Sequence, residues 1–252
     1  MTDATPKNMR ANGVKRKAAP NPTNWQFSKL KACMQAVENK LPDKVNLKKK
    51  FPPVYTQVYG SCSSNAVIAC DHYYYHTSKW HPSATFTYYN AIKDEEPIED
   101  TGSSIEAALD SVRHYGVCNA EVWPNEKPFN KKPTKKAYAD GLKGHEVTKY
   151  YNVKTILQIK KALSLGYPVV GAIAWAFKEY NSKYVLNTPT KEEIDNCEAY
   201  HAIVIVGYDD KTKKFEIRNS WSDKWANKGY GYITYDVMKQ IMCPDDTYAI
   251  VK

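Results

Sequence analysis

The sequence predicts an α+β fold in which a helical part faces a β-sheet part, with a cleft between them. The first half of the chain holds segments whose apolar residues recur at helical spacing. The second half holds short apolar runs that are separated by Gly and Asp turns, as strands are. Helices followed by a run of strands are typical of α+β proteins. We place the helical part at about residues 57–165 and the β-rich part at about residues 166–252.

The composition is that of a globular protein. Hydrophobic residues make up 42% of the 252 residues and charged residues 25%, which suits a sizeable core. No apolar run is long enough to cross a bilayer, so we expect no transmembrane segment. The N-terminus has basic residues but not the apolar core of a secretory signal. These features predict an intracellular, cytoplasmic protein (or a virion protein, if the source is a virus), and we expect a monomer.

The net charge of +9 resides in the N-terminal residues. Residues 1–50 hold twelve Lys and Arg against three acidic residues, and the charges of the remaining chain cancel. Such a segment can make a weak contact with nucleic acid or with an anionic surface. A solvated leader without a partner is the alternative. We define residues 1–40 as the basic N-terminal arm and residues 41–252 as the main domain.

The arm contains one amphipathic segment. Apolar residues recur at helical spacing between Trp25 and Asn39, which predicts a short helix. Trp25 and Phe27 are costly to leave exposed, since burying each is worth about 1.5–3 kcal/mol. We therefore expect this helix to dock on the main domain away from the cleft, while residues 1–20 stay mobile. Docking across the cleft as an inhibitory plug is the alternative.

The elements of the main domain follow in order. Residues 41–56 contain three prolines and are expected to be extended. A buried helix is expected to begin at Cys62, directly after Gly60 and Ser61, because the residues that follow recur at helical spacing. Further helices are predicted at about residues 83–93, 103–115 and 155–164, and strands at about residues 168–174, 201–208, 214–219 and 229–234.

The six cysteines are predicted to be free thiols. The chain is long, lacks a secretory signal and shows no tight cysteine spacing, which favours a reducing compartment over a disulfide framework. His72 and His76 stand four residues apart and could share a metal ion on one helix face. No further ligand stands at a suitable spacing, so packing is the preferred interpretation. We expect no metal ion and no organic cofactor.

Three residues are candidates for nucleophilic catalysis. Cys62 stands at a predicted helix N-terminus, where unpaired N–H groups and the helix dipole stabilise a thiolate. His201 opens a strand-like run and can take the thiol proton. Asn219 can accept a hydrogen bond from the imidazole and fix the orientation of the ring. Taken singly, each residue has a structural alternative, as a small core residue, a packed histidine and a turn residue.

The order and spacing of these residues, with the sequence around them, carry a family resemblance. The separation of Cys62 from His201 is 139 residues and that of Cys62 from Asn219 is 157. Matching stretches run in order from about residue 51 to residue 233: FPPVYTQVYGSCSSNA, PSATFTYYNA, DTGSSIEAALDSVRHYGVCNAEVWP, KKALSLGYPVV, YHAIVIVGYDD and RNSWSDKWANKGYGYI. In these stretches the chain resembles the papain family of cysteine peptidases, in which His and Asn follow the cysteine by roughly 130–150 residues. It is most similar to the branch of bacteria and large DNA viruses that lacks a long pro-domain.

The resemblance implies a papain-like fold and a cysteine-type endopeptidase that hydrolyses peptide bonds through a thioester. Cys62 would be the nucleophile, His201 the general base and acid, and Asn219 the residue that orients the histidine. The side chain of Gln57 and the backbone N–H of Cys62 would hold the oxyanion. The partner implied is a peptide or protein substrate.

The resemblance also assigns two residues to the substrate-binding side of the cleft. Gly102 would present its backbone to an extended peptide, in a strand-like pairing. Trp221 would shield the hydrogen bond between histidine and asparagine from water.

The chain departs from the family pattern around the nucleophile. Ser63 replaces an aromatic residue, and Tyr59 stands where secreted relatives place a disulfide cysteine. Gln57 precedes Cys62 by five residues, one fewer than in the family, and Val58 replaces a glycine. The shortened loop motivates an alternative function, a catalytically weak or inactive papain-fold binding or structural protein that associates with nucleic acid through the arm.

Overall fold

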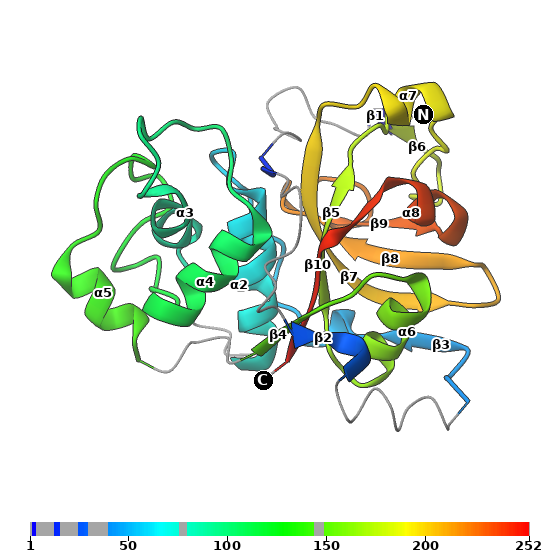
Figure 1. The fold of residues 1–252 in the computed structure, drawn as a ribbon, viewed down its shortest axis with the longest axis horizontal. Helices are drawn as coiled ribbons and strands as arrows, with labels where there is room; N and C mark the ends of the chain where they lie inside the picture. The colour runs from blue at the N-terminus through cyan, green and yellow to red at the C-terminus, as the bar shows by residue number, and fades with distance from the viewer. Residues whose placement is uncertain are drawn as a thin grey trace.

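A computed structural model shows a group of helices on one side of the molecule and a mostly antiparallel sheet, flanked by further helices, on the other (Figure 1). The predicted α+β arrangement is therefore confirmed. The structure describes residues 2–3, 13–15, 25–29, 40–75, 80–143 and 149–251.

The helical part is built around one central buried helix. Its helices are α2 (Cys62–Tyr75), α3 (Ala84–Ile92), α4 (Ile105–Tyr115) and α5 (Lys135–Gly141). The first three were predicted from the sequence, and α5 was not. Helix α2 is buried from Cys62 to Tyr73 because it packs against the sheet on one side and against α3 and α4 on the other.

The ends of α4 follow from its sequence. The hydroxyl of Ser104 accepts the N–H of Ala107 at 3.0 Å and so caps the first turn. Gly116 ends the helix with a φ of 66°, a conformation that favours glycine. A side chain there would also collide with Gly141, whose carbonyl oxygen would lie 1.8 Å from an added Cβ. These local signals position α4 beside α2.

The main sheet has the order β2-β4-β10-β5-β7-β8-β9, and β3 pairs with β7 off this path. The strands predicted from apolar runs near residues 168, 201, 214 and 229 are all present, whereas β2, β3, β4 and β10 were not predicted. The bounds are β2 (Trp25–Gln26), β3 (Lys44–Asn46), β4 (Lys149–Asn152), β5 (Val169–Ala174), β7 (Tyr200–Asp209), β8 (Lys214–Arg218), β9 (Tyr230–Thr234) and β10 (Met242–Val251).

Strand β7 is buried on both faces, which explains its unbroken apolar run. Ile203 and Ile205 belong to the core under α6 (Ile156–Ser164) and α8 (Tyr235–Ile241). The alternate residues Ala202, Val204 and Val206 belong to the core around α2. Period-two alternation thus places one set on each face, and a third, smaller core lies between α3 and α5. The strand that begins with Tyr200 and His201 is therefore rigidly held at the junction of the two parts.

The N-terminal residues differ from the sequence prediction. Instead of starting a helix, Trp25–Gln26 forms β2, which pairs in parallel with β4, and Phe27–Lys29 forms the 3₁₀ helix η1. The predicted helix is therefore wrong over these residues, and residues 30–39 lie outside the described part. Phe27 is fully buried in the sheet-side core. The segment docks on the main domain by non-local pairing, which overrides its helical spacing.

Smaller elements complete the fold. Residues 41–56, expected to be extended, contain β3 and the 3₁₀ helix η2 (Lys48–Lys50). A separate two-stranded sheet pairs β1 (Thr2–Asp3) with β6 (Glu179–Tyr180), followed by α7 (Lys191–Asp195). Within the described ranges, no helix combines the length and the apolar character that crossing a membrane demands.

The cysteines and histidines of the described residues behave as side chains of a packed protein. Cys62, Cys70, Cys118, Cys197 and Cys243 are free thiols, as predicted for them. The His72 imidazole bonds through Nδ1 to the hydroxyl of Tyr55 at 2.6 Å, and His76 lies outside the described part. Among the residues that the structure describes, no group of three or more His, Cys, Asp or Glu is placed to hold a metal ion.

Candidate active site

Cys62 is the first residue of α2, where the helix meets the sheet. The backbone turns into the helix at Gly60, and an added Cβ there would stand 3.2 Å from the nitrogen of Gly102. The Cys62 side chain is fully buried. Its thiol lies within hydrogen-bonding reach of the backbone of Ala202. Because Ala202 directly follows His201 on β7, the thiol lies beside the start of the strand that carries the candidate base.

A hydrogen bond joins His201 to Asn219. The Nε2 of His201 lies 2.7 Å from the Oδ1 of Asn219, and both residues are buried. The same Oδ1 accepts the backbone N–H of Ser220 at 2.7 Å, which agrees with its being the amide oxygen. An amide oxygen only accepts, so Nε2 must be the donor and Nδ1 the acceptor. An unprotonated Nδ1 is what a general base for a thiol needs.

Two indole rings enclose the imidazole. The Trp221 ring lies over His201, with the ring centroids 4.6 Å apart at an interplanar angle of 34°. Trp175, which follows β5, meets the same imidazole edge-on at 5.1 Å. Both indoles are buried, so they keep water away from the bond between His201 and Asn219 and lower the local dielectric.

Gln57 belongs to the same hydrogen-bonded cluster. Its Oε1 accepts the Ser220 hydroxyl at 2.6 Å, and its Nε2 donates to the carbonyl oxygen of Tyr59 at 3.2 Å. Its backbone N–H donates to the Ser220 carbonyl at 2.8 Å. Because Ser220 follows Asn219, the Gln57 amide is fixed between the Asn219 segment and the loop that leads to Cys62.

Residues 13–15 of the arm lie between the two parts, and we call the gap that they fill the cleft. On the helical side, Ser103 donates its N–H to the Gly13 carbonyl at 3.1 Å and accepts the Lys15 N–H at 3.2 Å. On the sheet side, Val14 donates its N–H to the Tyr200 carbonyl at 3.3 Å. The arm segment therefore bridges the cleft as an added strand would.

This arm segment rests directly on the candidate nucleophile. An added Cβ on Gly13 would stand 2.8 Å from the Cys62 sulfur and 2.5 Å from the Gly60 carbonyl oxygen. Val14 is buried in the same core cluster as Cys62, and Lys15 pairs with Glu95 at 2.5 Å. The expectation that residues 1–20 stay mobile is wrong for residues 13–15, because β-type pairing to both walls of the cleft and the burial of Val14 hold them there.

Gly102 and Ser103 share the contact with the arm. Gly102 has a φ of 88°, and an added Cβ would stand 2.3 Å from the Gly13 oxygen. Its N–H, however, donates to the hydroxyl of Tyr88 at 3.0 Å. The residue that pairs with the segment in the cleft is Ser103, one position after the sequence-based assignment. Gly102 supplies clearance, and Ser103 supplies the hydrogen bonds.

Burial holds the candidate catalytic pair in its neutral form. Removal from water raises the pKa of the Cys62 thiol to about 11 and lowers the pKa of His201 to about 4, against the opposing effect of its bond to Asn219. At neutral pH the thiol is therefore protonated and the imidazole uncharged while residues 13–15 fill the cleft. A thiolate–imidazolium pair requires that water or a substrate replace the arm.

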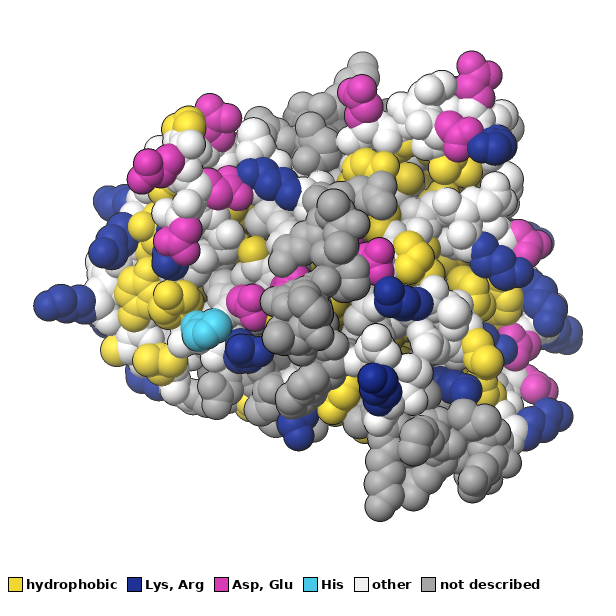
Figure 2. Space-filling view, in the orientation of Figure 1, with side chains coloured by type: hydrophobic (Ala, Val, Ile, Leu, Met, Phe, Trp, Pro, Cys, Tyr) yellow, Lys and Arg dark blue, Asp and Glu magenta, His cyan; other side chains and the backbone are white. Residues whose placement is uncertain are grey.

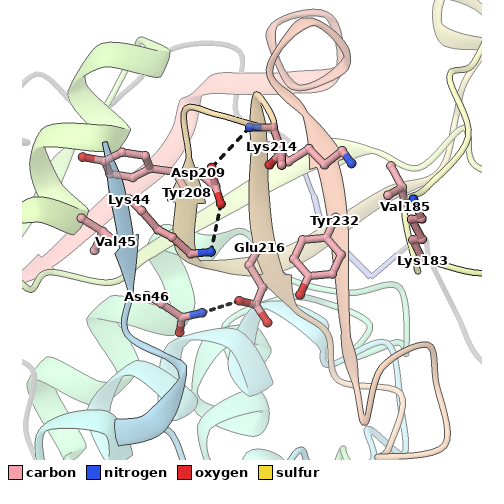
Figure 3. Close-up of a pocket in the computed structure, with 11 residues that line it drawn as sticks. Lys44, Val45, Asn46, Lys183, Val185, Tyr208, Asp209, Lys214, Glu216 and Tyr232 are labelled. Carbon is pink, nitrogen blue, oxygen red and sulfur yellow. Dashed lines mark hydrogen bonds and ion pairs between the residues drawn. The ribbon is translucent and has the colours of Figure 1, made fainter. Parts of the chain in front are cut away.

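A second hollow lies away from these residues, at the edge of the sheet (Figure 3). It has a volume of about 250 Å³ and is bordered by β3, β7, β8, β9 and residues 183–185. Figure 3 shows Lys44 reaching Asp209 and Asn46 reaching Glu216, at 2.9 and 2.7 Å. We call it the edge pocket.

Sequence reasoning singled out neither Trp175, Ser103 nor Gly13. Trp175 ends the apolar run of β5, and the pairing of Ile173 with His201 across β5 and β7 would have placed it near the histidine. Ser103 could be found only from the register of the backbone in the cleft. Gly13 gives no periodic signal in the arm, so nothing local pointed to its position.

Comparison with known proteins identifies the family of this chain. A family model described as papain family cysteine protease matches residues 54–250. An uncharacterized peptidase C1-like protein of Acanthamoeba polyphaga mimivirus is 31% identical over 196 residues, which are 70% of this chain and 62% of that protein. Peptidase 1 of Psoroptes ovis is 36% identical over 63 residues, or 24% of this chain and 18% of that protein. The chain thus spans less than two thirds of the length of either relative.

Solved structures of cysteine proteases resemble the structure of this chain. Xylellain, a cysteine protease from Xylella fastidiosa, superposes with a TM-score of 0.78 at 27% identity, covering 98% of this chain and all of that one. The proform of the ragweed pollen cysteine protease Amb a 11 has a TM-score of 0.66 at 21% identity, covering 97% of this chain and 75% of that one, and shows the shared fold. The match to residues 54–250 covers most of the chain, and the chain belongs to the papain family of cysteine proteases.

Proposed function

We propose that this chain is a cysteine endopeptidase with Cys62 as nucleophile, His201 as general base and acid, and Asn219 as the residue that orients the imidazole. One observation carries the proposal. The 2.7 Å hydrogen bond from His201 to Asn219 leaves Nδ1 as the acceptor, and the next residue of β7, Ala202, has its backbone within reach of the thiol of Cys62, the first residue of a buried helix. Family membership supports the same assignment.

The proposed mechanism is acyl transfer in two steps. His201 takes the thiol proton, the Cys62 sulfur attacks the peptide carbonyl carbon, and the carbonyl electrons move to oxygen. The backbone N–H of Cys62 and the Gln57 amide are proposed to stabilise this oxyanion. As the C–N bond breaks, the imidazolium protonates the leaving amine. Water, deprotonated by His201, then attacks the thioester and releases the acid and the thiol.

We propose that Ser103 holds the substrate backbone next to the nucleophile, with Gly102 leaving room for it and Trp221 keeping the histidine dry. The support is the way residues 13–15 pair with Ser103 through both its N–H and its carbonyl. A peptide that replaces the arm meets the same donor and acceptor. Activity therefore requires the arm to leave the cleft, which makes the described arrangement a resting state.

The test is a peptide-library assay of the wild type beside Cys62→Ala. The Cys62→Ala protein is expected to fold normally and to lose turnover, since it retains the core and lacks the nucleophile. Labelling by an epoxide-type thiol inhibitor reports on Cys62 directly. Peptide cleavage by Cys62→Ala at the wild-type rate would reject the mechanism, and absence of both labelling and cleavage after removal of the arm would favour an inactive scaffold.

We propose a monomeric intracellular or virion protein, supported by the free thiols, with residues 1–40 as arm and residues 41–252 as peptidase domain. A weak contact of residues 1–50 with nucleic acid or an anionic surface is supported only by their net charge. Figure 2 shows Lys and Arg side chains spread over both parts of this face. Salt-dependent nucleic-acid binding that vanishes without residues 1–24 would support this contact.

A further inference from the structure

We propose that Tyr88 and Asp100 form a positioning clip, which sets the spacing between the nucleophile Cys62 and the backbone at Ser103 that holds a peptide in the cleft. The inference rests on the peptidase function proposed above and adds two positioning residues to it. Neither residue touches the reacting atoms; both act through the backbone on either side of the cleft.

The clip joins two backbone segments through one carboxylate oxygen. The N–H of Gly60 donates to the Oδ1 of Asp100 at 2.8 Å, and the hydroxyl of Tyr88 donates to the same oxygen at 3.0 Å. That hydroxyl in turn accepts the N–H of Gly102 at 3.0 Å. Gly60 stands two residues before the nucleophile and Gly102 one residue before Ser103. The chain of hydrogen bonds therefore fixes the nucleophile loop against the peptide-pairing backbone.

The setting of the clip makes these hydrogen bonds strong. Tyr88 lies on α3 and is fully buried, and the bond that its hydroxyl accepts from Gly102 is buried with it. Bonds to an ionised carboxylate are roughly twice as strong as bonds between neutral groups. Burial and the nearby Asp100 carboxylate raise the pKa of Tyr88 well above its usual value, so the phenol remains a donor at physiological pH.

A second link, on the other side of the nucleophile, joins the same backbone. The hydroxyl of Ser63 donates to the Ser103 carbonyl oxygen at 3.0 Å, and the two hydroxyl oxygens lie 2.8 Å apart. Both serines are buried. Positions 60 and 63 are thus both tied to residues 102–103, with Cys62 between them. This contact gives a purpose to the small polar residue at position 63, where the family has an aromatic ring.

Spacing across the cleft matters because thioester formation needs the sulfur and the carbonyl carbon in near-attack geometry. A displacement of about 1 Å can cost about 100-fold in rate. A peptide paired with Ser103 moves with that backbone, so a loosened clip leaves the peptide bound but misplaced over Cys62. The expected signature is a lower kcat with little change in KM.

The experiment compares Tyr88→Phe with a matched control in the full chain. Tyr88→Phe keeps the ring and removes the hydroxyl. Tyr138→Phe removes a comparable, partly buried bond, from the Tyr138 hydroxyl to the Asn90 Oδ1 at 2.9 Å, in the same helical part but away from the cleft. Both are made in a Gly13→Val background, because a side chain at position 13 collides with Cys62 and Gly60 and is expected to displace the arm from the cleft.

Tyr88→Phe is expected to lower kcat about tenfold, with KM changed less than about twofold. Alkylation of Cys62 by iodoacetamide should stay unchanged, since that reagent does not use Ser103. Tyr138→Phe should lower the melting temperature about as much as Tyr88→Phe does, and it should leave kcat unchanged. Asp100→Asn, which keeps an acceptor, should be milder than Asp100→Ala. The proposal is overturned if kcat is the same in both Tyr→Phe variants, or if alkylation falls in step with kcat.

A readout that does not need turnover separates the clip from the proposed function. Amide hydrogen exchange at Gly60 and Gly102, measured in the otherwise wild-type chain, should accelerate in Tyr88→Phe and not in Tyr138→Phe. Unchanged exchange at both glycines overturns the clip whatever the activity is. Accelerated exchange in a protein that cleaves no peptide in any background supports the clip as a link between the two segments and rejects the peptidase instead.

Discussion

The cleft over Cys62 and the edge pocket differ in what occupies them. The cleft is filled by the chain's own residues 13–15, and the groups beneath them, Cys62 and His201, are fully buried. The edge pocket is open, and its acids are matched by cations at the surface: Lys44 with Asp209 at 2.9 Å and Lys48 with Glu216 at 3.1 Å.

The difference shows two ways of setting a protonation state. In the cleft, burial alone drives the pKa of His201 down and that of Cys62 up, so both groups are neutral. In the edge pocket, the hydrogen bond and charge of Lys44 lower the pKa of Asp209, so both groups are charged. Chemistry in the cleft therefore depends on what fills it, whereas the edge pocket keeps its charges whatever the arm does.

The largest expected effect is on the free energy of unfolding and concerns Phe27, which fixes the arm to the sheet-side core. Phe27→Ala should lower the free energy of unfolding by about 3–5 kcal/mol, because Phe27 is fully buried in the sheet-side core. Urea denaturation measures it, with the exposed neighbour Lys29→Ala as a control that should change little. A loss below about 1 kcal/mol would show that the arm is separable from the domain up to residue 40.

Acid should weaken the filled cleft specifically. The pKa of His201 is about 4 with the arm in place and 6.5 as its ordinary value, so the imidazole gains a proton more readily once the arm leaves. The filled state is therefore favoured above about pH 6.5 and loses stability relative to the open state as the pH falls towards 4, by at most about 1.4 kcal/mol per pH unit.

The acid effect is measured as the difference in melting temperature between the wild type and Gly13→Val from pH 7 to pH 4. The difference should shrink as the pH falls, and it should be flat when both proteins also carry His201→Ala. A difference that does not depend on pH would mean that the cleft does not control the protonation of the histidine.

Gly13→Val should raise peptide turnover at least tenfold, equivalent to about 1.4 kcal/mol. The added side chain would lie 2.8 Å from the Cys62 sulfur and 2.5 Å from the Gly60 oxygen, so the arm can no longer rest on the nucleophile. Turnover is measured at equal active-site titre. Lys15→Ala is the control, because it removes only the half-exposed pair with Glu95 and should change turnover less than about fivefold. Unchanged turnover in Gly13→Val would show that the arm does not limit activity.

The smallest effect belongs to the edge pocket. Lys44→Met removes the exposed partner of Asp209 and should change neither peptide turnover nor the melting temperature measurably, since exposed ion pairs contribute little. A marked loss of turnover in Lys44→Met would mean that the two hollows communicate through β7, which borders both.

Local patterns account for the parts of the fold and site that the sequence predicts. The helix that begins at Cys62 has residues at helical spacing, and His201 opens a continuous apolar run, so the burial of both elements can be seen in a short window. Asn219 ends a predicted strand, and the family spacing connects it to the other two residues. The bond from His201 to Asn219 joins two residues that the family spacing assigns to one site.

What the sequence did not predict depends on pairing between distant segments. Trp25 and Gln26 form a strand because β4 offers a free edge to them, although their spacing is helical. The arm pairs with Ser103 and not with Gly102, because the Tyr88 hydroxyl takes the Gly102 N–H. Gly13 acts through the absence of a side chain, which no hydropathy pattern records.

The position of Gly13 over Cys62 determines how the arm can be released from the cleft. Covalent attachment gives the arm an effective concentration on the order of millimolar at the cleft, so a few backbone hydrogen bonds and the burial of Val14 suffice to hold it there. One cut in the chain between Lys15 and Trp25 would leave Phe27 anchored and turn residues 13–15 into a free peptide. At micromolar protein concentration that peptide would be diluted about a thousandfold relative to its tethered state. A single cleavage would thus open the cleft by lowering the local concentration of the arm peptide. The opening would be irreversible, although the residues that line the cleft would not change.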